Sequence, residues 1–177
     1  VASPLFRGGA WIKDAGGLLD PAKLALGLLA AAERAGVRVH EGTPALGLAK
    51  SARGVEVRTP RGTVSARGAL LGTSAYPPLL RRVRRYVAPV YDYALMTEPL
   101  SAAQREAIGW RRRQGVGDGG NRFHYYRLTD DDRILWGGFE AVYRYGGPVR
   151  PDLDEDQETF ALLARNFFTT FPQLEGL

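Results

Sequence analysis

The residues best suited to binding a ligand are a dense group of aromatic side chains around one arginine. The group comprises Phe123, Tyr125, Tyr126, Trp136, Phe139, Tyr143 and Tyr145. Side chains alternate between the two faces of a strand, so Tyr125 and Arg127 share one face with Phe123, while His124 and Tyr126 share the other. Two interpretations fit this pattern. Either the sheet has one packed and one hydrated face, or an aromatic wall binds a planar apolar ligand while the arginine binds a carboxylate.

The other residue types that support catalysis occur singly. His40 and His124 lack a second histidine or a carboxylate cluster at metal-ligand spacing, which favours structural roles. Ser74 follows an apolar segment, but no glycine stands two residues after it, as a nucleophile elbow requires. The aspartates at 130–132 are more typical of a solvated turn than of a calcium loop. The chain has no cysteine, which excludes disulfides and thiolate chemistry. We therefore predict no metal site and no catalytic side chain.

Arginine dominates the charged residues, and this leaves another function open. The formal net charge is +5 with 24 basic side chains, of which only Lys13, Lys23 and Lys50 are lysine. Basic clusters occur at 81–85 and 111–113. Arginine pairs with carboxylates and phosphates through two parallel hydrogen bonds. The alternative function is therefore a cofactor-free binding domain for an acidic ligand or a nucleic acid, although such clusters also occur on solvated helix faces.

The first part of the chain predicts one helix followed by strands. Asp20 and Pro21 suit the start of the helix, and Gly36 suits its end. The helix carries so few charges that we expect other segments to cover it. Strands are predicted at 10–13, 37–41, 54–59 and 63–66, the last running into 69–73. We expect a hairpin turn at 60–62 and burial of 69–71 on both faces.

The second part of the chain predicts an antiparallel sheet. A strand is expected over 87–97 and a flexible glycine-rich loop over 115–120. Strands at 123–128 and 133–136 flank a polar tip, which is typical of a hairpin.

Two further helices are predicted in this part, at 101–109 and 154–171. The second is capped by acidic residues and places four apolar side chains on one face: Phe160, Leu163, Phe167 and Phe171. The predicted fold class is α+β, with two incomplete layers rather than one closed domain.

Five segments, in this order along the chain, resemble the flavin-dependent D-amino-acid oxidase superfamily. The resemblance is closest to its glycine, sarcosine and gamma-glutamylputrescine oxidases, and it covers residues 8–177. The segments are Gly17–Leu24, Gly36–Thr43, Ala69–Tyr76, Pro89–Leu100 and Tyr125–Gly138. Members of the superfamily begin with a strand, a Gly-x-Gly-x-x-Gly loop and a helix that holds the FAD pyrophosphate. This chain lacks that loop, so we expect a middle fragment that by itself binds FAD weakly and turns over no substrate.

The resemblance implies an antiparallel or mixed substrate-domain sheet with flanking helices, together with part of an FAD-binding α/β domain. It divides the chain into an entry segment (1–19), part of the FAD-binding domain (20–80), the substrate-binding sheet (81–160) and a helix returning to the FAD-binding domain (161–177). It implies FAD contacts at Ala45, Gly72, Thr73, Ser74 and Tyr76. It implies substrate contacts at Tyr125, Tyr126 and Arg127, with Arg127 as the carboxylate clamp.

The reaction implied by the resemblance is hydride transfer to the flavin from a carbon that bears an amine. The expected substrate is a small amino acid or secondary amine, and the expected location is the cytoplasm. The resemblance implies neither a nucleic-acid nor a membrane partner.

Overall fold

A computed structural model describes residues 1–13 and 16–176 of the chain. The predicted segments 1–19 and 161–177 each include residues outside this described part. The chain divides into two compact units. Unit 1 comprises Val1–Leu18, Val90–Arg144 and Arg150–Leu177, and unit 2 comprises Leu19–Pro89 and Tyr145–Val149. Each unit combines helix with an antiparallel sheet, which confirms the predicted α+β class. None of the helices in the described part has the length and apolar content that a membrane span needs.

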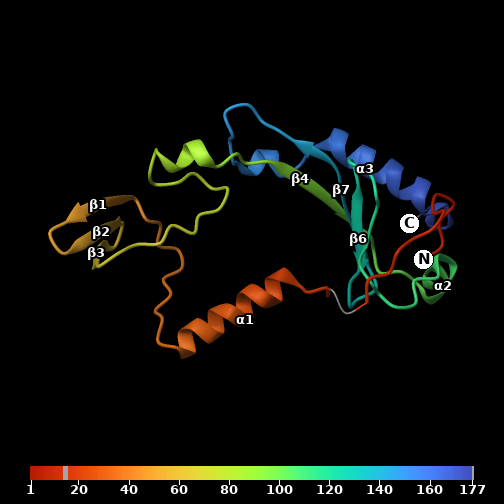
Figure 1. The fold of residues 1–177 in the computed structure, drawn as a ribbon, viewed down its shortest axis with the longest axis horizontal. Helices are drawn as coiled ribbons and strands as arrows, with labels where there is room; N and C mark the ends of the chain where they lie inside the picture. Colours follow the sequence, from red (N-terminus) through yellow and green to blue (C-terminus); the bar gives the residue numbers. More distant parts are fainter. Residues whose placement is uncertain (14–15, 177) are drawn as a thin grey trace. The chain divides into compact units, whose positions relative to one another are not determined.

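Unit 2 contains the helix α1 (Pro21–Arg34), a 3-10 turn η1 (Val83–Tyr86) and a three-stranded antiparallel sheet (Figure 1). The strands are β1 (Gly47–Ser51), β2 (Gly54–Thr59) and β3 (Gly62–Ala66), in the order β1-β2-β3. The helix begins as predicted, because the Asp20 carboxylate accepts hydrogen bonds from the first free backbone N–H groups of α1. The predicted hairpin is confirmed as β2–β3, with Val57 opposite Val64.

Two strand predictions in unit 2 are wrong. Residues 37–41 form no strand, and 47–51 pair with β2 in their place. The segment 69–73 also forms no strand and is not buried on both faces, since Leu70 is 97% exposed. Alternation was present at 37–41 and apolar content at 69–73, but a strand also needs a partner edge. The edges of β2 are taken by β1 and β3, which adjoin it in the chain.

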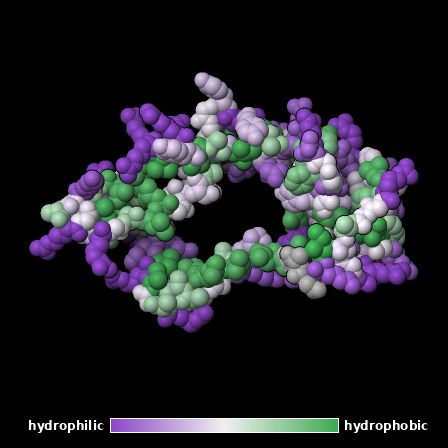
Figure 2. All heavy atoms as spheres, viewed as in Figure 1, coloured by the Kyte–Doolittle hydropathy of each residue, from purple (hydrophilic) through white to green (hydrophobic). Residues whose placement is uncertain are grey.

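The predicted covering of α1 is absent from the described part of the chain. Leu24, Leu26 and Leu28 are 48%, 66% and 61% exposed, and Figure 2 shows apolar atoms along the surface of this helix. No residue of α1 is buried. The few charges of α1 therefore do not reflect burial within unit 2.

Unit 1 is built on a four-stranded antiparallel sheet in the order β4-β7-β6-β5. The strands are β4 (Tyr91–Met96), β5 (Val116–Gly117), β6 (His124–Leu128) and β7 (Ile134–Val142). The predicted hairpin is confirmed as β6–β7, with Tyr126 opposite Trp136. Part of the predicted loop at 115–120 is strand instead, because β5 pairs with β6. Residues 10–13, predicted as a strand, form none.

The helices of unit 1 are α2 (Ala102–Ile108) and α3 (Gln157–Thr170), with 3-10 turns η2 (Pro151–Leu153) and η3 (Pro172–Leu174). Ser101 and Gln104 form a capping box at α2, and the Asp156 carboxylate caps α3. Figure 1 shows α3 lying along one face of the sheet. The predicted apolar face of α3 is confirmed, since Leu163 and Phe167 belong to the core.

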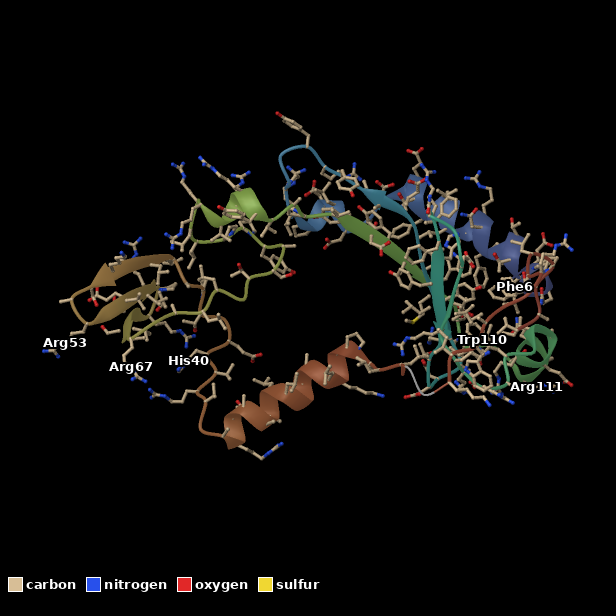
Figure 3. All side chains as sticks on the ribbon, viewed as in Figure 1. Phe6, His40, Arg53, Arg67, Trp110 and Arg111 are labelled. Carbon is tan, nitrogen blue, oxygen red and sulfur yellow. The ribbon has the colours of Figure 1, made fainter. Side chains whose placement is uncertain are left out.

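The core of unit 1 is a cluster of aromatic rings between α3 and the sheet. Trp136 is 1% exposed. Its ring centroid lies 4.2 Å from that of His124 and 4.7 Å from that of Tyr126, while Phe167 meets it edge-on at 5.6 Å. Trp110 extends the cluster at the end next to α2 (Figure 3). This packing fixes which face of β6 and β7 is buried and leaves the opposite face open.

Candidate functional site

The two faces of the unit 1 sheet have different environments, and they separate the predicted substrate residues. Along β6, His124, Tyr126 and Leu128 are buried toward α3, whereas Tyr125 is 38% exposed and Arg127 is half-buried on the opposite side. The predicted alternation is therefore confirmed. The structure brings Tyr125 and Arg127 to one face and places Tyr126, 2% exposed, in the aromatic core.

The face opposite α3, called the open face below, combines four large side chains with one carboxylate and two very small residues. It consists of Asp92, Ala94, Met96, Leu135, Gly137, Tyr125 and Arg127. The strand register places Gly137 between Tyr125 and Ala94, and Leu135 between Arg127 and Met96. One row across the sheet is thus a tyrosine beside two very small residues, and the next is an arginine beside two apolar ones. This arrangement leaves room over Gly137 and Ala94 for a ring or a ligand.

Tyr125 uses this room by lying across the sheet. A Cβ atom at Gly137 would lie 2.8 Å from both Cζ and Oη of Tyr125, so the ring occupies the space that a side chain would need. The Tyr125 hydroxyl donates a hydrogen bond of 2.9 Å to Oδ2 of Asp92 on β4. Partial burial and this hydrogen bond raise the pKa of Tyr125 to about 12. The phenol is therefore a neutral hydrogen-bond donor at physiological pH.

Asp92 is a residue of this face that the sequence prediction missed. Its signal was present, because alternation along 91–96 places Asp92 with Ala94 and Met96 and away from the buried Tyr93. The contact with Tyr125, however, spans 33 positions and depends on β7 lying between β4 and β6. The order of the strands could not be read from spacing alone.

Arg127 carries a charge that unit 1 does not neutralise. Across residues 1–13 and 16–176, no carboxylate lies within ion-pair distance of its guanidinium. Arg122, close by in the sequence, pairs with Glu140 at 2.8 Å. A guanidinium without a partner on an open sheet face can bind a carboxylate through two parallel hydrogen bonds.

The buried side of β6 holds His124 as a structural residue, in line with the sequence interpretation. Its ring stacks between Trp136 and Phe139, and its Nε2 and Nδ1 atoms lie 3.1 Å from the Asn166 amide and 3.3 Å from the Gly137 carbonyl. Burial lowers the pKa of His124, with smaller opposing effects from the Gly137 carbonyl and Asp118. The imidazole is therefore kept neutral, as its place among aromatic rings requires.

A cavity of about 990 Å³ also lies within unit 1, on this buried side. The N-terminal segment, residues 114–119 around β5, and α3 line it, with Asp118, His124 and Asn166 among its polar groups. Asp118 is already engaged, since it accepts hydrogen bonds from the His124 backbone N–H and the Tyr126 hydroxyl. None of the predicted site residues except Tyr126 lines this cavity.

The predicted FAD contacts lie on connecting segments of unit 2. Ala45 is exposed just before β1, and Gly72, Thr73, Ser74 and Tyr76 lie between β3 and η1. The backbone N–H of Tyr76 donates to the Thr73 carbonyl at 3.0 Å, which closes a turn around Ser74. Ser74 has a φ of 48°, a left-handed conformation that favours glycine. Tyr76 is 67% exposed, so its ring face is free to contact a ligand.

Some arginines of the two basic clusters form contacts within the units. Arg113 hydrogen bonds to the Thr129 carbonyl and pairs with Asp132, while the Arg112 guanidinium lies 4.3 Å from the Trp11 ring centroid. Arg84 donates to the Gly146 carbonyl within unit 2. The described residues contain no group of three or more acidic and histidine side chains arranged to hold a metal ion.

Comparison with known proteins places the sequence of this chain in a family. The family model for FAD-dependent oxidoreductases, DAO, matches residues 2–177. A probable oxidoreductase OrdL of Haemophilus influenzae is 28% identical over the whole chain, and the gamma-glutamylputrescine oxidoreductase of Escherichia coli is 31% identical over the whole chain. A second probable oxidoreductase OrdL, from Rhizobium meliloti, is 33% identical over 73% of the chain.

These alignments span 39%, 39% and 30% of the respective relatives, so the chain is much shorter than the curated proteins it matches. No solved structure matches the chain with statistical significance. The relatives are consistent with the branch that the sequence predicts. The chain belongs to the DAO family of FAD-dependent oxidoreductases.

Proposed function

We propose that the protein oxidises the C–N bond of an amino acid or secondary amine, with unit 1 binding the substrate on its open face. The observation that carries this proposal is the unpaired guanidinium of Arg127 on a sheet face whose neighbouring residues in the same row, Leu135 and Met96, are apolar. A carboxylate-bearing substrate would bind Arg127, and its hydrocarbon part would contact Leu135 and Met96.

The residues of unit 2 fit a partial FAD contact but not the pyrophosphate site. Thr73, Ser74 and Tyr76 offer hydroxyl groups, a turn and an exposed ring, which suit the edge of a nucleotide or of its flavin. The N-terminus of α1 does not suit a phosphate, because the Asp20 carboxylate already accepts from its free N–H groups. We therefore assign Ala45, Gly72, Thr73, Ser74 and Tyr76 to secondary contacts with FAD.

Bound FAD would accept a hydride from the carbon that bears the amine, so the chain itself needs no strong base for that step. What this chain supplies is orientation. Arg127 would fix the carboxylate, and Tyr125, whose single O–H donates to Asp92 and whose raised pKa keeps it neutral, would line the site without adding charge. Among the described residues the open face carries no histidine, and His124 is buried among aromatic rings.

The proposal is tested by anaerobic reduction of the flavin in protein expressed from its complete reading frame. A panel of amines and amino acids, with and without a carboxylate, is mixed with the oxidised protein, and loss of visible flavin absorbance is followed. Arg127→Gln should raise the half-saturating concentration of carboxylate-bearing substrates at least about tenfold and leave carboxylate-free amines unchanged. Arg150→Gln, which removes an exposed arginine paired with Asp152, is the control. Reduction by no amine at all would overturn the proposed reaction.

A further inference from the structure

The formal charge of the chain is divided unevenly between the two units. Unit 2 contains twelve basic and four acidic side chains, a formal charge of +8, whereas unit 1 contains twelve basic and fifteen acidic side chains, a formal charge of −3. Residues 57–89 of unit 2 contain seven arginines and no acidic side chain. An excess of one charge over a short segment is typical of a surface that binds a polyanion.

Four of these arginines lie in or next to η1, in the basic cluster at 81–85. Arg81, Arg82 and Arg85 are exposed, and the cluster forms no ion pair with any residue in the described ranges. A 3-10 helix has three residues per turn, so Arg82 and Arg85 project from the same side of η1. Two guanidinium groups are therefore presented together to solvent, where they can pair with two neighbouring anionic groups of one ligand.

Two exposed tyrosines accompany the arginines within unit 2. Tyr86 ends η1 and is 87% exposed, and Tyr145 is fully exposed in the loop at 145–149. The Arg84 guanidinium donates a hydrogen bond of 3.2 Å to the Gly146 carbonyl, which joins this loop to η1. Neither tyrosine ring stacks on another ring or on a cation in the described part of the chain. Both rings are therefore free to contact a ligand.

Solubility alone does not explain this combination of residues. Soluble surfaces mix charges of both signs and expose few aromatic rings, whereas here the charges have one sign and two phenol rings are exposed. An acidic protein would pair with the arginines, but its carboxylates make no use of the face of a tyrosine ring. A single-stranded nucleic acid fits both features, since its phosphates pair with guanidinium groups and its unpaired bases stack on aromatic rings.

We propose that η1 and the loop at 145–149 form a surface that binds single-stranded nucleic acid, called the arginine–tyrosine surface below. It consists of Arg81, Arg82, Arg85, Tyr86 and Tyr145. The arginines bind phosphates and the tyrosines stack with bases, and the binding is independent of sequence because every base offers a ring face. This surface goes beyond the proposed oxidation and does not depend on it, because none of its residues belongs to the open face of unit 1.

Fluorescence anisotropy with protein expressed from its complete reading frame tests the proposal without relying on turnover. The labelled probes are a single-stranded oligonucleotide of about 12 nucleotides, an abasic strand with the same number of phosphates, and a poly-glutamate of equal charge. Wild type should bind the oligonucleotide at least about tenfold more tightly than either of the other probes, since stacking of two bases contributes at least that much. The affinity should fall steeply as the salt concentration rises.

Variants separate the phosphate contacts from the stacking contacts. The double variant Arg82→Gln/Arg85→Gln should weaken binding of both strands at least about tenfold and reduce the slope of log affinity against log salt by about 1.4, because each phosphate contact contributes about 0.7. Arg122→Gln/Arg150→Gln is the matched control, since it removes the same charge from arginines that are already paired with carboxylates, and it should leave the slope unchanged. Tyr145→Leu should weaken binding of the oligonucleotide at least about fivefold and leave the abasic strand unaffected, while Tyr145→Phe should bind like wild type.

Three results would overturn the proposal. Failure to bind the oligonucleotide at low salt would remove it outright. Equal affinity for the three probes, or tighter binding of poly-glutamate, would show that the surface recognises charge alone and would indicate an acidic protein as its partner. An equal loss of affinity in Arg122→Gln/Arg150→Gln and Arg82→Gln/Arg85→Gln would show that net charge, and not the arginine–tyrosine surface, governs binding. Because Tyr145 is fully exposed, its substitution should leave the fold intact and its effect reports on binding.

Discussion

Unit 1 and unit 2 have similar secondary structure but are held together in different ways. Every buried hydrophobic side chain in the described part of the chain lies in unit 1, and half of these residues are aromatic. Within unit 2 no described residue reaches the same degree of burial, and the most regular contacts are the backbone ladders of β1, β2 and β3. Unit 1 is therefore stabilised by side-chain packing, whereas unit 2 depends on backbone hydrogen bonds and turn geometry.

This difference in packing also separates the proposed substrate residues of unit 1 from the predicted FAD contacts of unit 2. Tyr125, Arg127 and Asp92 project from strands whose opposite face is fixed by packing against α3, so their positions are set by a rigid sheet. The predicted FAD contacts lie on connecting segments without a packed layer beneath them. A substrate face on a packed sheet can discriminate by fixed distances, and loops are better suited to adjust to a bound group.

Removal of the central core ring should give the largest effect. Trp136→Ala leaves a cavity among His124, Tyr126 and Phe167, and we expect a loss of about 3–5 kcal/mol in the free energy of unfolding. Leu26→Ala in α1, where the side chain is 66% exposed, should change it by less than about 0.5 kcal/mol. Urea denaturation followed by far-ultraviolet circular dichroism, which reports on the helices of both units, measures both. Equal effects of the two substitutions would contradict the comparison.

The stability of unit 2 should instead be lowered most by substitutions that strain its backbone. Gly54 has a φ of 141°, and a Cβ atom there would lie 2.3 Å from the Ala66 carbonyl oxygen on the neighbouring strand. Gly54→Ala should therefore add a clash to the 1–3 kcal/mol or so of backbone strain, and amide hydrogen exchange should lose protection in β2 and β3. Gly62→Ala is the matched control, since its φ is 133° but no atom lies near the added methyl group. Loss of protection in β6 or β7 would show that the units are not independently stabilised.

The elements predicted correctly from the sequence are those whose signals are local. Asp20 and Pro21 mark the start of α1 through groups two or three residues away. The β6–β7 hairpin was predictable because its polar tip and its alternating strands adjoin each other in the chain. The same alternation separated Tyr125 and Arg127 from His124, which is why the open face could be anticipated.

The sequence predictions were weakest where the structure of a segment depends on which other segments pack or pair with it. Residues 37–41 and 69–73 have strand-like composition, but no free edge of the unit 2 sheet is paired with them. Tyr126 was assigned to the substrate site on the resemblance; the structure places it on the buried side of β6, where it lines the cavity of unit 1, and the assignment stays a prediction. Asp92 was missed because its role depends on a strand order that spacing does not encode.

The two histidines provide a smaller test of the same comparison. Burial lowers the pKa of His124 below its usual 6.5, so the folded protein binds fewer protons at this site than the unfolded chain does. The free energy of unfolding is therefore expected to fall as the pH drops below about 6.5, because protonation favours the unfolded state. His124→Gln should reduce this slope between pH 7.5 and 5.5, measured by urea denaturation. His40→Gln, which alters the exposed histidine of unit 2 (Figure 3), is the control.

The smallest effect on stability is expected at Gly137, although it should change the open face clearly. A methyl group there would lie 2.8 Å from Cζ and Oη of Tyr125, so Gly137→Ala should displace the ring from Asp92. Since partial burial and the Asp92 hydrogen bond raise the pKa of Tyr125 to about 12, losing them should return it toward 10. NMR of ring-labelled tyrosine at pH 11, with Tyr125→Phe for assignment, would then detect an ionised Tyr125 in the variant and a neutral one in wild type.

Gly117→Ala is the matched control, because Gly117 lies opposite Tyr125 on β5 and the atom nearest to an added methyl group there is 3.8 Å away. If Gly137→Ala leaves the titration of Tyr125 unchanged, the position of the Tyr125 ring does not depend on the space over Gly137. The open face would then hold its side chains no more rigidly than the loops of unit 2 do.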